Sequence, residues 1–315
     1  MRIAACITTR NRSEKLNDCL KALWNSSVKP HSVVVSDDSQ DIEVQQANQE
    51  VVNKYPGTSY ITGPKRGVCA NRNNAVNATS ALETDFVAFV DDDICVEPDF
   101  IANAVERYSQ IPTDQRKYTI LTGASTSTQG QKLLPSKLSF RGYFCATEGT
   151  PETVVIHAAL FPRQFFSQEQ WDEDIFFGYE DAELCLRAIK YDYKIVSCPE
   201  LQVNEKSTDS VLDTPGIGRV SNYELHIEAA RLYVGIKRYK NLFPNPIKLL
   251  AFLTIYFVHM SGYLLKRGAI QAWQDINRRS RIHLLWQKKD VSQPEAVSSI
   301  KDISQSEGVS SIIVS

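Results

Sequence analysis

The most prominent group of chemically active side chains is a run of three carboxylates, Asp91-Asp92-Asp93, directly after the apolar run Phe86–Val90. Three adjacent carboxylates repel one another, so the cluster costs stability unless a cation compensates its charge. Asp91 and Asp93 stand two residues apart and share one side of an extended turn. Their oxygens suit Mg²⁺ or Mn²⁺, either of which can bridge to a diphosphate. A solvated acidic turn is the alternative, and the three residues by themselves favour it.

Two further clusters could contact a nucleotide. Asp37-Asp38-Ser39 follows the apolar residues Val33–Val35, and a carboxylate there can accept the imide N–H of a uracil-type base or simply cap the next helix. Gly67–Asn73 lies at the start of a predicted helix, where Arg72 and free backbone amides can meet a phosphate. Alternatively, Arg72 pairs with the acidic loops and holds the fold together.

A fourth cluster, Phe176–Asp181, opens a predicted helix whose apolar residues recur at helical spacing. We expect the helix dipole and the free amides to hold Asp181 ionised. An ionised carboxylate in a cleft can take a proton from an attacking hydroxyl. A plain helix cap is the alternative, and it is the better interpretation of an isolated Glu180-Asp181 pair.

The segments that must position these clusters alternate between strand and helix. This alternation predicts an α/β fold, with a mostly parallel sheet flanked by helices on both faces. In such sheets the ligand loops follow the carboxyl ends of the strands, where Thr8–Arg12, Asp37–Asp41 and Asp91–Asp93 stand. The predicted strands are Ile3–Thr8, His31–Ser36, Ser59–Thr62 and Phe86–Val90, and the predicted helices are Ser13–Asn25 (capped by Ser13), Glu43–Tyr55, Cys69–Ala81 and Pro98–Ser109.

The rest of the chain is less regular. Ser207–Arg219 has Asp, Pro and Gly and little periodicity, which predicts a linker or loop. Val291–Ser315 holds eight serines, which predicts a disordered tail. The remaining predicted strands are Tyr118–Gly123, Thr153–Phe161 and Lys194–Cys198, and the remaining predicted helices are Asp181–Tyr191 and Tyr223–Tyr239.

Composition excludes several other classes of protein. The chain has 315 residues, 43% hydrophobic and 23% charged, which is typical of a globular protein, and its net charge of −2 gives no basic field for nucleic acid. Seven cysteines, an odd number without a CxxC pair, indicate reduced thiols in a cytoplasmic protein. The first glycine is Gly57, so no glycine-rich phosphate loop follows the first strand. The five histidines form no HxH or HExxH pair.

The C-terminal part is basic and partly apolar. Val220–Asp290 contains 12 Lys/Arg and 4 Asp/Glu, and within it Leu249–Leu265 carries no Asp, Glu, Lys or Arg. A buried helix pair with a solvated basic face and a helix lying on an anionic membrane surface are both consistent with this pattern. A spanning helix is the least favoured of the three, because a span needs about 20 apolar residues.

Taken in order, the clusters resemble those of one family. The sequence is similar to the inverting glycosyltransferases of the family 2 type, as found in bacterial polysaccharide synthesis, which have the GT-A fold. The resemblance covers Ile3–Ala188, about two-thirds of the chain. The segments that carry it are ITTRNR, VVVSDDSQD, GVCANRNNA, FVDDDICVEPDF and WDEDIFFGYEDAELCLRA.

The resemblance implies a role for each matching residue. Asp181 would be the catalytic base, with Glu180 beside it at the acceptor. A divalent cation, Mn²⁺ or Mg²⁺, would be held by Asp93 and Asp91, with Asn204 as a further metal ligand. The nucleotide-sugar donor would be contacted by Thr8, Arg10, Asp38, Arg72, Asp91 and Asp92.

The sequence departs from the family pattern in two places. Many members carry a histidine, as a metal or phosphate ligand, on the strand that here contains Gln202–Ser207, and Asn204 or Glu205 takes its position. The usual Gly-Gly before the acceptor segment is replaced by Glu169-Gln170. The resemblance therefore leaves open the use of a metal and the choice of acceptor.

The working hypothesis is an enzyme in three parts. Residues 1–210 would form the transferase domain, 220–290 a basic helical region and 291–315 a disordered tail. The enzyme would transfer a hexosyl or deoxyhexosyl group, with inversion, from a nucleotide sugar to a hydroxyl of a glycan or lipid-linked glycan. Family frequency favours a UDP-linked donor. The expected location is the cytoplasm, at the inner face of the membrane, with no nucleic-acid partner.

Two alternatives stay open. One is a relative that binds a nucleotide or a glycan without turnover. The other is a sugar nucleotidyltransferase, which would want a glycine-rich loop after the first strand, where Thr8–Arg12 has no glycine.

Overall fold

The computed structural model describes residues 1–207 and 215–287. Most of the predicted linker Ser207–Arg219, the predicted domain boundary at residue 210 and the whole serine-rich tail lie outside these residues. Met1–Ile282 forms one compact unit.

The first part of the chain alternates between strands and helices, as predicted, except that Ile94–Val96 forms a short strand, which was not predicted, directly after Phe86–Asp91. Apolar residues at helical spacing, for example Leu16, Leu20 and Leu23, explain why the intervening segments are helical. Arg12 precedes the first helix, so Ser13 is its first residue and not its cap. The elements are β1 (Ile3–Thr9), α1 (Ser13–Trp24), β2 (Ser32–Asp37), α2 (Ile42–Val52), β3 (Thr58–Thr62), α3 (Val68–Ala78), β4 (Phe86–Asp91), β5 (Ile94–Val96) and α4 (Phe100–Ser109).

The middle part differs from its prediction in two places. The strand expected at Thr153–Phe161 begins only at Ala159, because Ile156–Ala158 forms a short 3-10 helix. The strand expected at Lys194–Cys198 runs on to Glu205 after an irregularity between Ser197 and Gln202. The elements are α5 (Thr113–Arg116), β6 (Thr119–Thr126), β7 (Lys132–Leu133), β8 (Lys137–Leu138), β9 (Phe144–Cys145), β10 (Ala159–Pro162), α6 (Glu180–Lys190) and β11 (Lys194–Glu205).

One mixed sheet organises the unit, in the order β3-β2-β1-β4-β10-β6-β11-β5, with β7 beside β6. The first four strands in this order are parallel, and β6 pairs with β11 in parallel. β10 runs antiparallel to β4 and β6, and β5 runs antiparallel to β11. The α/β prediction is therefore confirmed, and the antiparallel β10 links its two parallel parts.

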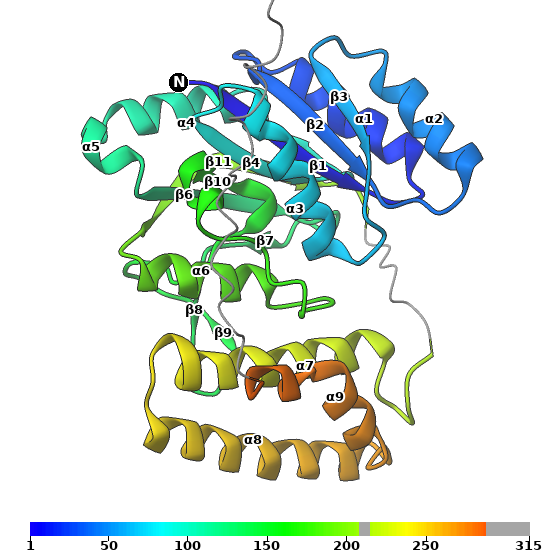
Figure 1. Cartoon of the computed structure of the whole chain (residues 1–315), viewed down its shortest axis with the longest axis vertical. Coiled ribbons are helices and arrows are strands. Elements are labelled where there is room, and N and C mark those ends of the chain that lie inside the picture. The colour runs from blue at the N-terminus through cyan, green and yellow to red at the C-terminus, as the bar shows by residue number, and fades with distance from the viewer. Residues whose placement is uncertain (208–214, 288–315) are drawn as a thin grey trace, which may run out of the picture. The chain divides into compact units, whose positions relative to one another are not determined.

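Helices cover both faces of this sheet (Figure 1). Because successive side chains of a strand point to opposite faces, Ile3, Ala5 and Ile7 of β1 share one core with α1, α2 and α4. On another strand, Phe89 of β4 packs edge-on against Phe166 and Trp171, with ring centroids 5.4 and 5.1 Å apart. Trp171 thereby ties the segment before α6 to the sheet.

The described residues from 215 onward contain three α-helices: α7 (Asn222–Lys237), α8 (Pro246–Lys266) and α9 (Ala272–Ser280). Ser221 caps α7 in a reciprocal pair with Glu224, and Asn245 caps α8 by accepting a hydrogen bond from Lys248 N at 2.9 Å. A π-helical turn, Arg238–Leu242, ends α7. The basic C-terminal region is therefore helical, as expected.

Gly123 of β6 lies directly against the backbone of β11. A Cβ at this position would lie 1.8 Å from the carbonyl oxygen of Leu201 in β11. We expect Gly123→Ala to lower the free energy of unfolding by about 2 kcal/mol or more, because backbone cannot yield as a side chain can. Urea denaturation measures the change.

Gly262→Ala in α8 is the matched control, since a Cβ there has no described atom within 4 Å. Alanine in a helix should be neutral or stabilising by up to about 1 kcal/mol. Equal stability of the Gly123→Ala variant and the wild type would contradict the register of β6 and β11.

Candidate active site

Three parallel strands bring the predicted nucleotide residues to one edge of the sheet. Thr8 of β1 lies opposite Ser36 of β2 and Asp91 of β4, and Thr9 lies opposite Asp37. The loops after β1, β2 and β4 therefore open side by side, at the ligand-binding edge of a parallel sheet.

The two aspartates after β2 have different environments. Asp37 is fully buried, and its carboxylate shapes the loop. Asp38 accepts a hydrogen bond from Lys65 N at 2.8 Å, and burial raises its pKa, although the exposed Arg10 acts in the opposite direction. The donors to Asp37 are Ser39 N, Asn48 Nδ2 and Tyr60 Oη, at 2.8, 2.9 and 2.8 Å. Asp38 is thus the better placed of the two to contact a base.

Gly63 belongs to the same corner, and the sequence analysis missed it. A Cβ at Gly63 would lie 2.2 Å from Asp38 Oδ1 and 2.5 Å from Asn71 Oδ1. Only a glycine lets both polar side chains approach this backbone. The Gly63-Pro64 turn signal after the third predicted strand could have indicated it.

Arg72 of α3 lies at the centre of the site and is 4% exposed. Its guanidinium donates to Glu180 Oε1 at 3.1 Å and to Asp91 Oδ1 at 3.2 Å. It also lies over the ring of Trp171, 4.9 Å from the centroid. Although burial alone would raise the pKa of Asp91, Arg72 lowers it, helped by His157. One cation therefore joins the predicted nucleotide end of the site to the predicted catalytic end.

The other two carboxylates of the acidic run contact Arg12. Its Nη1 donates to Asp92 Oδ1 at 3.2 Å and to Asp93 Oδ2 at 2.9 Å. Asp92 is buried and also accepts from Thr9 Oγ1 at 2.7 Å, and burial raises its pKa to about 6. Burial and Asp91 together raise the pKa of Asp93.

These contacts bear on the divalent cation that the resemblance implies. Guanidinium groups already neutralise Asp91 and Asp93, and in the part of the chain that is described no three His, Cys, Asp or Glu side chains converge as a metal-binding group. As placed, the residues do not fit a metal ion. The metal assignment therefore stays a prediction.

The structure brings His157 and Glu205 to this centre. The sequence analysis did not name His157, and it gave Glu205 only as the alternative to Asn204 at the position of the family histidine. His157 Nδ1 lies 3.9 Å from Asp91 Oδ2, and His157 Nε2 lies 3.7 Å from Glu205 Oε1. Burial lowers the pKa of His157, while the charges of Asp91 and Glu205 act in the opposite direction. Asn204, the predicted metal ligand, instead donates to Glu97. Adjacent strand residues point to opposite faces, which is why Glu205 reaches the site and Asn204 does not.

Asp181 and Glu180 begin α6 after Tyr179, whose φ of 61° is left-handed. Burial, followed by the charge of Glu180, raises the pKa of Asp181. The expectation that the helix start holds Asp181 ionised is therefore wrong in direction, because both causes outweigh the hydrogen bond from Ala182 N. A carboxylate with a raised pKa is a stronger base once it ionises.

Several buried polar atoms of this centre have no hydrogen-bond partner among the described residues. They are Arg72 Nε, His157 Nε2, Trp171 Nε1 and Glu180 Oε2. Because buried polar atoms are satisfied almost everywhere in proteins, by protein groups or by water, these four atoms have capacity for further polar partners.

A buried ion cluster fixes the start of α6 to α7. Lys237 Nζ lies 2.5 Å from Asp172 Oδ2 and 2.6 Å from Glu183 Oε1. Arg187 Nε lies 2.8 Å from Glu183 Oε1, and Tyr233 Oη donates to Asp172 at 2.8 Å. The C-terminal helices therefore hold the segment that carries Asp181.

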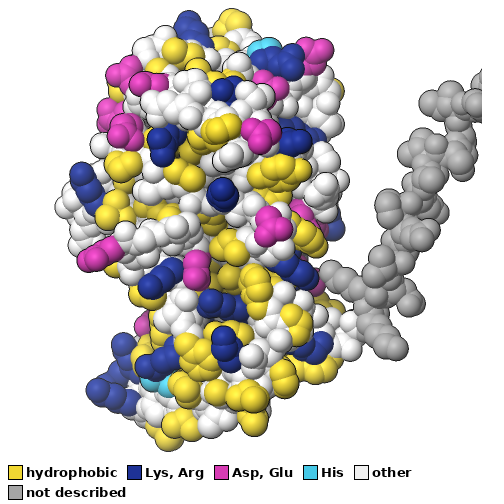
Figure 2. Space-filling view, turned by 90° about the vertical axis from the view of Figure 1, so that its left-hand side faces the viewer, with side chains coloured by type: hydrophobic (Ala, Val, Ile, Leu, Met, Phe, Trp, Pro, Cys, Tyr) yellow, Lys and Arg dark blue, Asp and Glu magenta, His cyan; other side chains and the backbone are white. Residues whose placement is uncertain are grey.

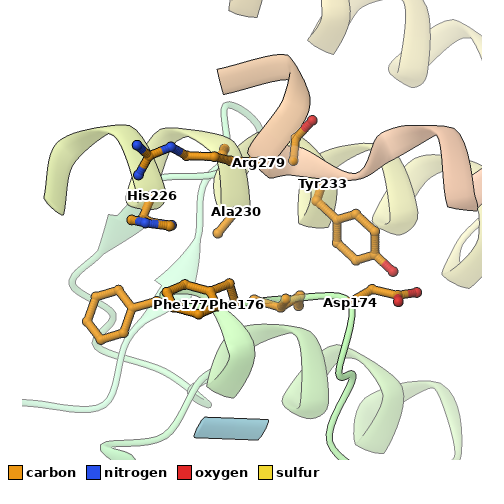
Figure 3. Close-up of a pocket in the computed structure, with 10 residues that line it drawn as sticks. Asp174, Phe176, Phe177, His226, Ala230, Tyr233 and Arg279 are labelled. Atoms are coloured by element: carbon orange, nitrogen blue, oxygen red, sulfur yellow. The ribbon is translucent and has the colours of Figure 1, made fainter. Parts of the chain in front are cut away.

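Apolar packing completes this attachment. Figure 3 shows Phe176 and Phe177 below α7, with His226 and Tyr233 pointing down from that helix. Phe176 and His226 have ring centroids 4.9 Å apart. The cavity between these groups has a volume of about 10 Å³. That is room for about one water molecule, so this place is a packing contact and not a ligand pocket.

The structure thus gathers Thr8, Asp38, Arg72, Asp91–Asp93, Glu180 and Asp181 around one edge of the sheet. Arg10 is exposed at the end of β1. Asn204 makes its contact elsewhere. The individual roles of these residues stay predictions.

A family model described as "Glycosyl transferase family 2" matches residues 4–168. A search of the curated proteins found no match. The matched region contains β1, β2, β4 and the acidic run, and it ends before Asp181.

Solved structures with the same fold include S. aureus TarS. Its complex with UDP-GlcNAc is 18% identical, with a TM-score of 0.56 over 90% of this chain and 84% of that chain. The chain spans 44% of another, longer TarS structure. GalNAc-T7 with UDP, GalNAc and Mn²⁺ is 12% identical, with a TM-score of 0.55 over 85% of this chain and 58% of that one. These matches confirm the expected GT-A fold.

Asp92 generates a prediction about pH. Its pKa of about 6 exceeds the unfolded value of about 4, so between these values the folded state binds more protons than the unfolded state. Stability due to this group must fall as the pH rises from 4 to 6. The free energy of unfolding of the Asp92→Asn variant, relative to that of the wild type, should therefore increase by about 2 to 3 kcal/mol from pH 4 to pH 6. Denaturation at several pH values measures it.

Asp114→Asn, which alters an exposed carboxylate of α5, is the control and should leave the pH dependence unchanged. A difference between Asp92→Asn and wild type that stays constant with pH would show that Asp92 is not a buried acid.

Lys237 generates a second prediction. Lys237→Met leaves Asp172 and Glu183 without their shared cation, and breaking a buried ion pair costs about 3 to 5 kcal/mol. Adding Asp172→Asn should restore part of the loss, because one stranded charge is removed. A double-mutant cycle by urea denaturation checks this, and purely additive effects would refute the ion cluster.

Proposed function

Because the chain belongs to glycosyltransferase family 2, we propose that it transfers a sugar from a nucleotide-sugar donor to a hydroxyl acceptor. The transferred group is a hexosyl or deoxyhexosyl unit, and the donor is UDP-linked. The acceptor is a glycan or lipid-linked glycan. The observation that carries the proposal is Arg72, which ties Asp91 at the sheet edge to Glu180 beside Asp181.

The donor end of the site is formed by the three parallel strand ends. Asp38 accepts the imide N–H of the base, and Thr8 lines the same loop. Asp91 accepts a hydrogen bond from a ribose hydroxyl, because Arg72 lowers its pKa and so keeps the carboxylate ionised. Arg10, Arg12 and Arg72 supply the positive charge at the strand ends, which favours the departing diphosphate. The support for UDP is that TarS binds UDP and UDP-GlcNAc at a similar fold.

The catalytic end is formed by the start of α6. The acceptor hydroxyl attacks the anomeric carbon, its proton passes to Asp181, and the bond from that carbon to the diphosphate oxygen breaks. Burial and Glu180 raise the pKa of Asp181, which strengthens it as a base near neutral pH. A single displacement with one base and no protein nucleophile inverts the anomeric configuration.

Whether a divalent cation binds Asp93 is left to experiment. The GalNAc-T7 structure, which has a similar fold, contains Mn²⁺. In this chain Arg12 already pairs with Asp93, so a bound cation would have to displace it. Activity that persists in chelator would assign the charge compensation to the arginines.

The test is release of nucleoside diphosphate from a panel of nucleotide sugars, with Mn²⁺, Mg²⁺ or chelator. Slow donor hydrolysis reports turnover before the acceptor is known. Asp181→Asn should lower the rate at least about 100-fold, the low end of general-base effects. Because the base works only when ionised, the wild-type rate should fall as the pH drops through the raised pKa of Asp181, and Asp181→Asn should lose this dependence.

Asp114→Asn, an exposed carboxylate of α5, is the matched control and should hydrolyse donor like the wild type. Nucleotide binding without release from any donor, even with glycan acceptors, would favour a non-catalytic relative. Release of pyrophosphate from a nucleoside triphosphate and a sugar phosphate would identify a nucleotidyltransferase instead. A product with retained anomeric configuration would refute the single displacement.

A further inference from the structure

The outward face of α8 carries large exposed apolar side chains near both ends and in the middle of the helix. Ile247, Leu250, Val258 and Leu265 are 80, 68, 71 and 65% exposed. Of the described helices, α8 alone is long and apolar enough to cross a membrane, and only 22% of its apolar window is buried. A surface helix of a globular protein normally turns charged residues outward. The exposed apolar face of α8 therefore indicates an interaction surface.

The inward face of α8 is fixed to α7. Phe252, Tyr256, Met260 and Leu264 recur every fourth residue and are buried. Tyr256 Oη donates to Glu228 O of α7 at 2.8 Å, and Tyr263 Oη donates to Glu224 Oε1 at 2.8 Å. The helix cannot turn its apolar face inward, because that side is already packed.

The close packing of α7 on α8 also disfavours a span. A Cβ at Gly235 would lie 2.1 Å from Phe252 Cζ, so the two helices are in direct contact. The buried Arg231 guanidinium lies 4.5 Å from the Tyr256 ring centroid and pairs with Glu228. A spanning α8 would draw this ion pair into lipid, where charges are costly.

The charges around the apolar face have one sign. Lys240–Arg281 contains seven Lys/Arg and one acidic residue, Asp275, which pairs with Arg278 and Arg279. Lys248 and Lys266 stand near the two ends of α8, and the helix has no Asp or Glu. Figure 2 shows hydrophobic side chains at the lower end of the molecule, with Lys and Arg around them. The complementary surface is therefore apolar and anionic.

A second copy of the chain does not supply such a surface. Antiparallel pairing of two α8 helices would set Lys248 against Lys266, and parallel pairing would set each lysine against itself. Like charges in such positions destabilise the contact. Lipid phosphates around an acyl layer match both the apolar face and the lysines.

We propose that α8 docks this protein on an anionic lipid surface, lying in the plane of the interface. Ile247, Leu250, Val258 and Leu265 enter the boundary between headgroups and acyl chains, and Lys248 and Lys266 contact lipid phosphates. Docking itself does not depend on the proposed transferase activity. A lipid-linked acceptor follows only if both the docking and the proposed transferase activity hold.

The experiment is flotation of the full chain with phosphatidylcholine vesicles that contain or lack phosphatidylglycerol. We expect the protein to bind the anionic vesicles and this binding to weaken as the salt concentration rises. Binding to the neutral vesicles should be at least about ten-fold weaker, because each lysine near an anionic lipid surface increases the affinity about five-fold. The double variant Lys248→Gln/Lys266→Gln should lose about 25-fold on anionic vesicles and should change little on neutral ones.

The apolar contribution is tested with Leu250→Glu/Val258→Glu, which should lower binding at least about ten-fold. Ile42→Glu is the matched control, because Ile42 of α2 is also 68% exposed and lies outside the C-terminal helices. It should bind as the wild type does. Thermal melting and donor hydrolysis in solution show that each variant is folded, and they keep this test separate from that of the transferase.

Three results would overturn the proposal. Failure of the wild type to float with anionic vesicles excludes lipid docking. A wild-type dimer that Leu250→Glu/Val258→Glu converts to monomers, with vesicle binding unchanged, assigns the face to a second copy. Vesicle-bound protein that resists extraction by alkaline carbonate indicates a span.

Discussion

The rest of the site depends on the ion pairs of one buried side chain, the guanidinium of Arg72. It comes from α3 and contacts Asp91 at the end of β4, Glu180 at the start of α6 and the ring of Trp171. A buried charge is tolerated only when its partners surround it, so these groups fix one another's positions. The helix that carries the proposed base is thereby tied to the strand that carries the proposed donor contact.

Carboxylates that are neighbours in space are made chemically different by their surroundings. Arg72 lowers the pKa of Asp91, whereas burial raises those of Asp92 and Asp181. Asp92 accepts hydrogen bonds from Thr9 and Arg12, so its carboxylate has a structural role. Asp181 combines partial exposure with a raised pKa, the combination that suits proton transfer. The division of roles follows from environment, since all three are the same residue type.

The C-terminal helices have two faces with different tasks. α7 holds the segment before α6 through Lys237 and Asp172, and α8 covers α7 with its buried stripe. The opposite face of α8 is apolar and is flanked by lysines. If that face lies on lipid as we propose, the helices that position the base also orient the protein at the surface that carries its acceptor.

The sequence by itself determined the helices of the first part of the chain, its strands apart from β5, and the polar clusters after three of those strands, because apolar periodicity and turn residues are local signals. It also indicated Asp181 and Arg72. Only the tertiary structure decided that Arg12 pairs with Asp93, that His157 and Glu205 join Asp91, and that the pKa of Asp181 is raised. Those features depend on burial and on contacts between residues far apart in the chain, and packing of the sheet and helices creates both.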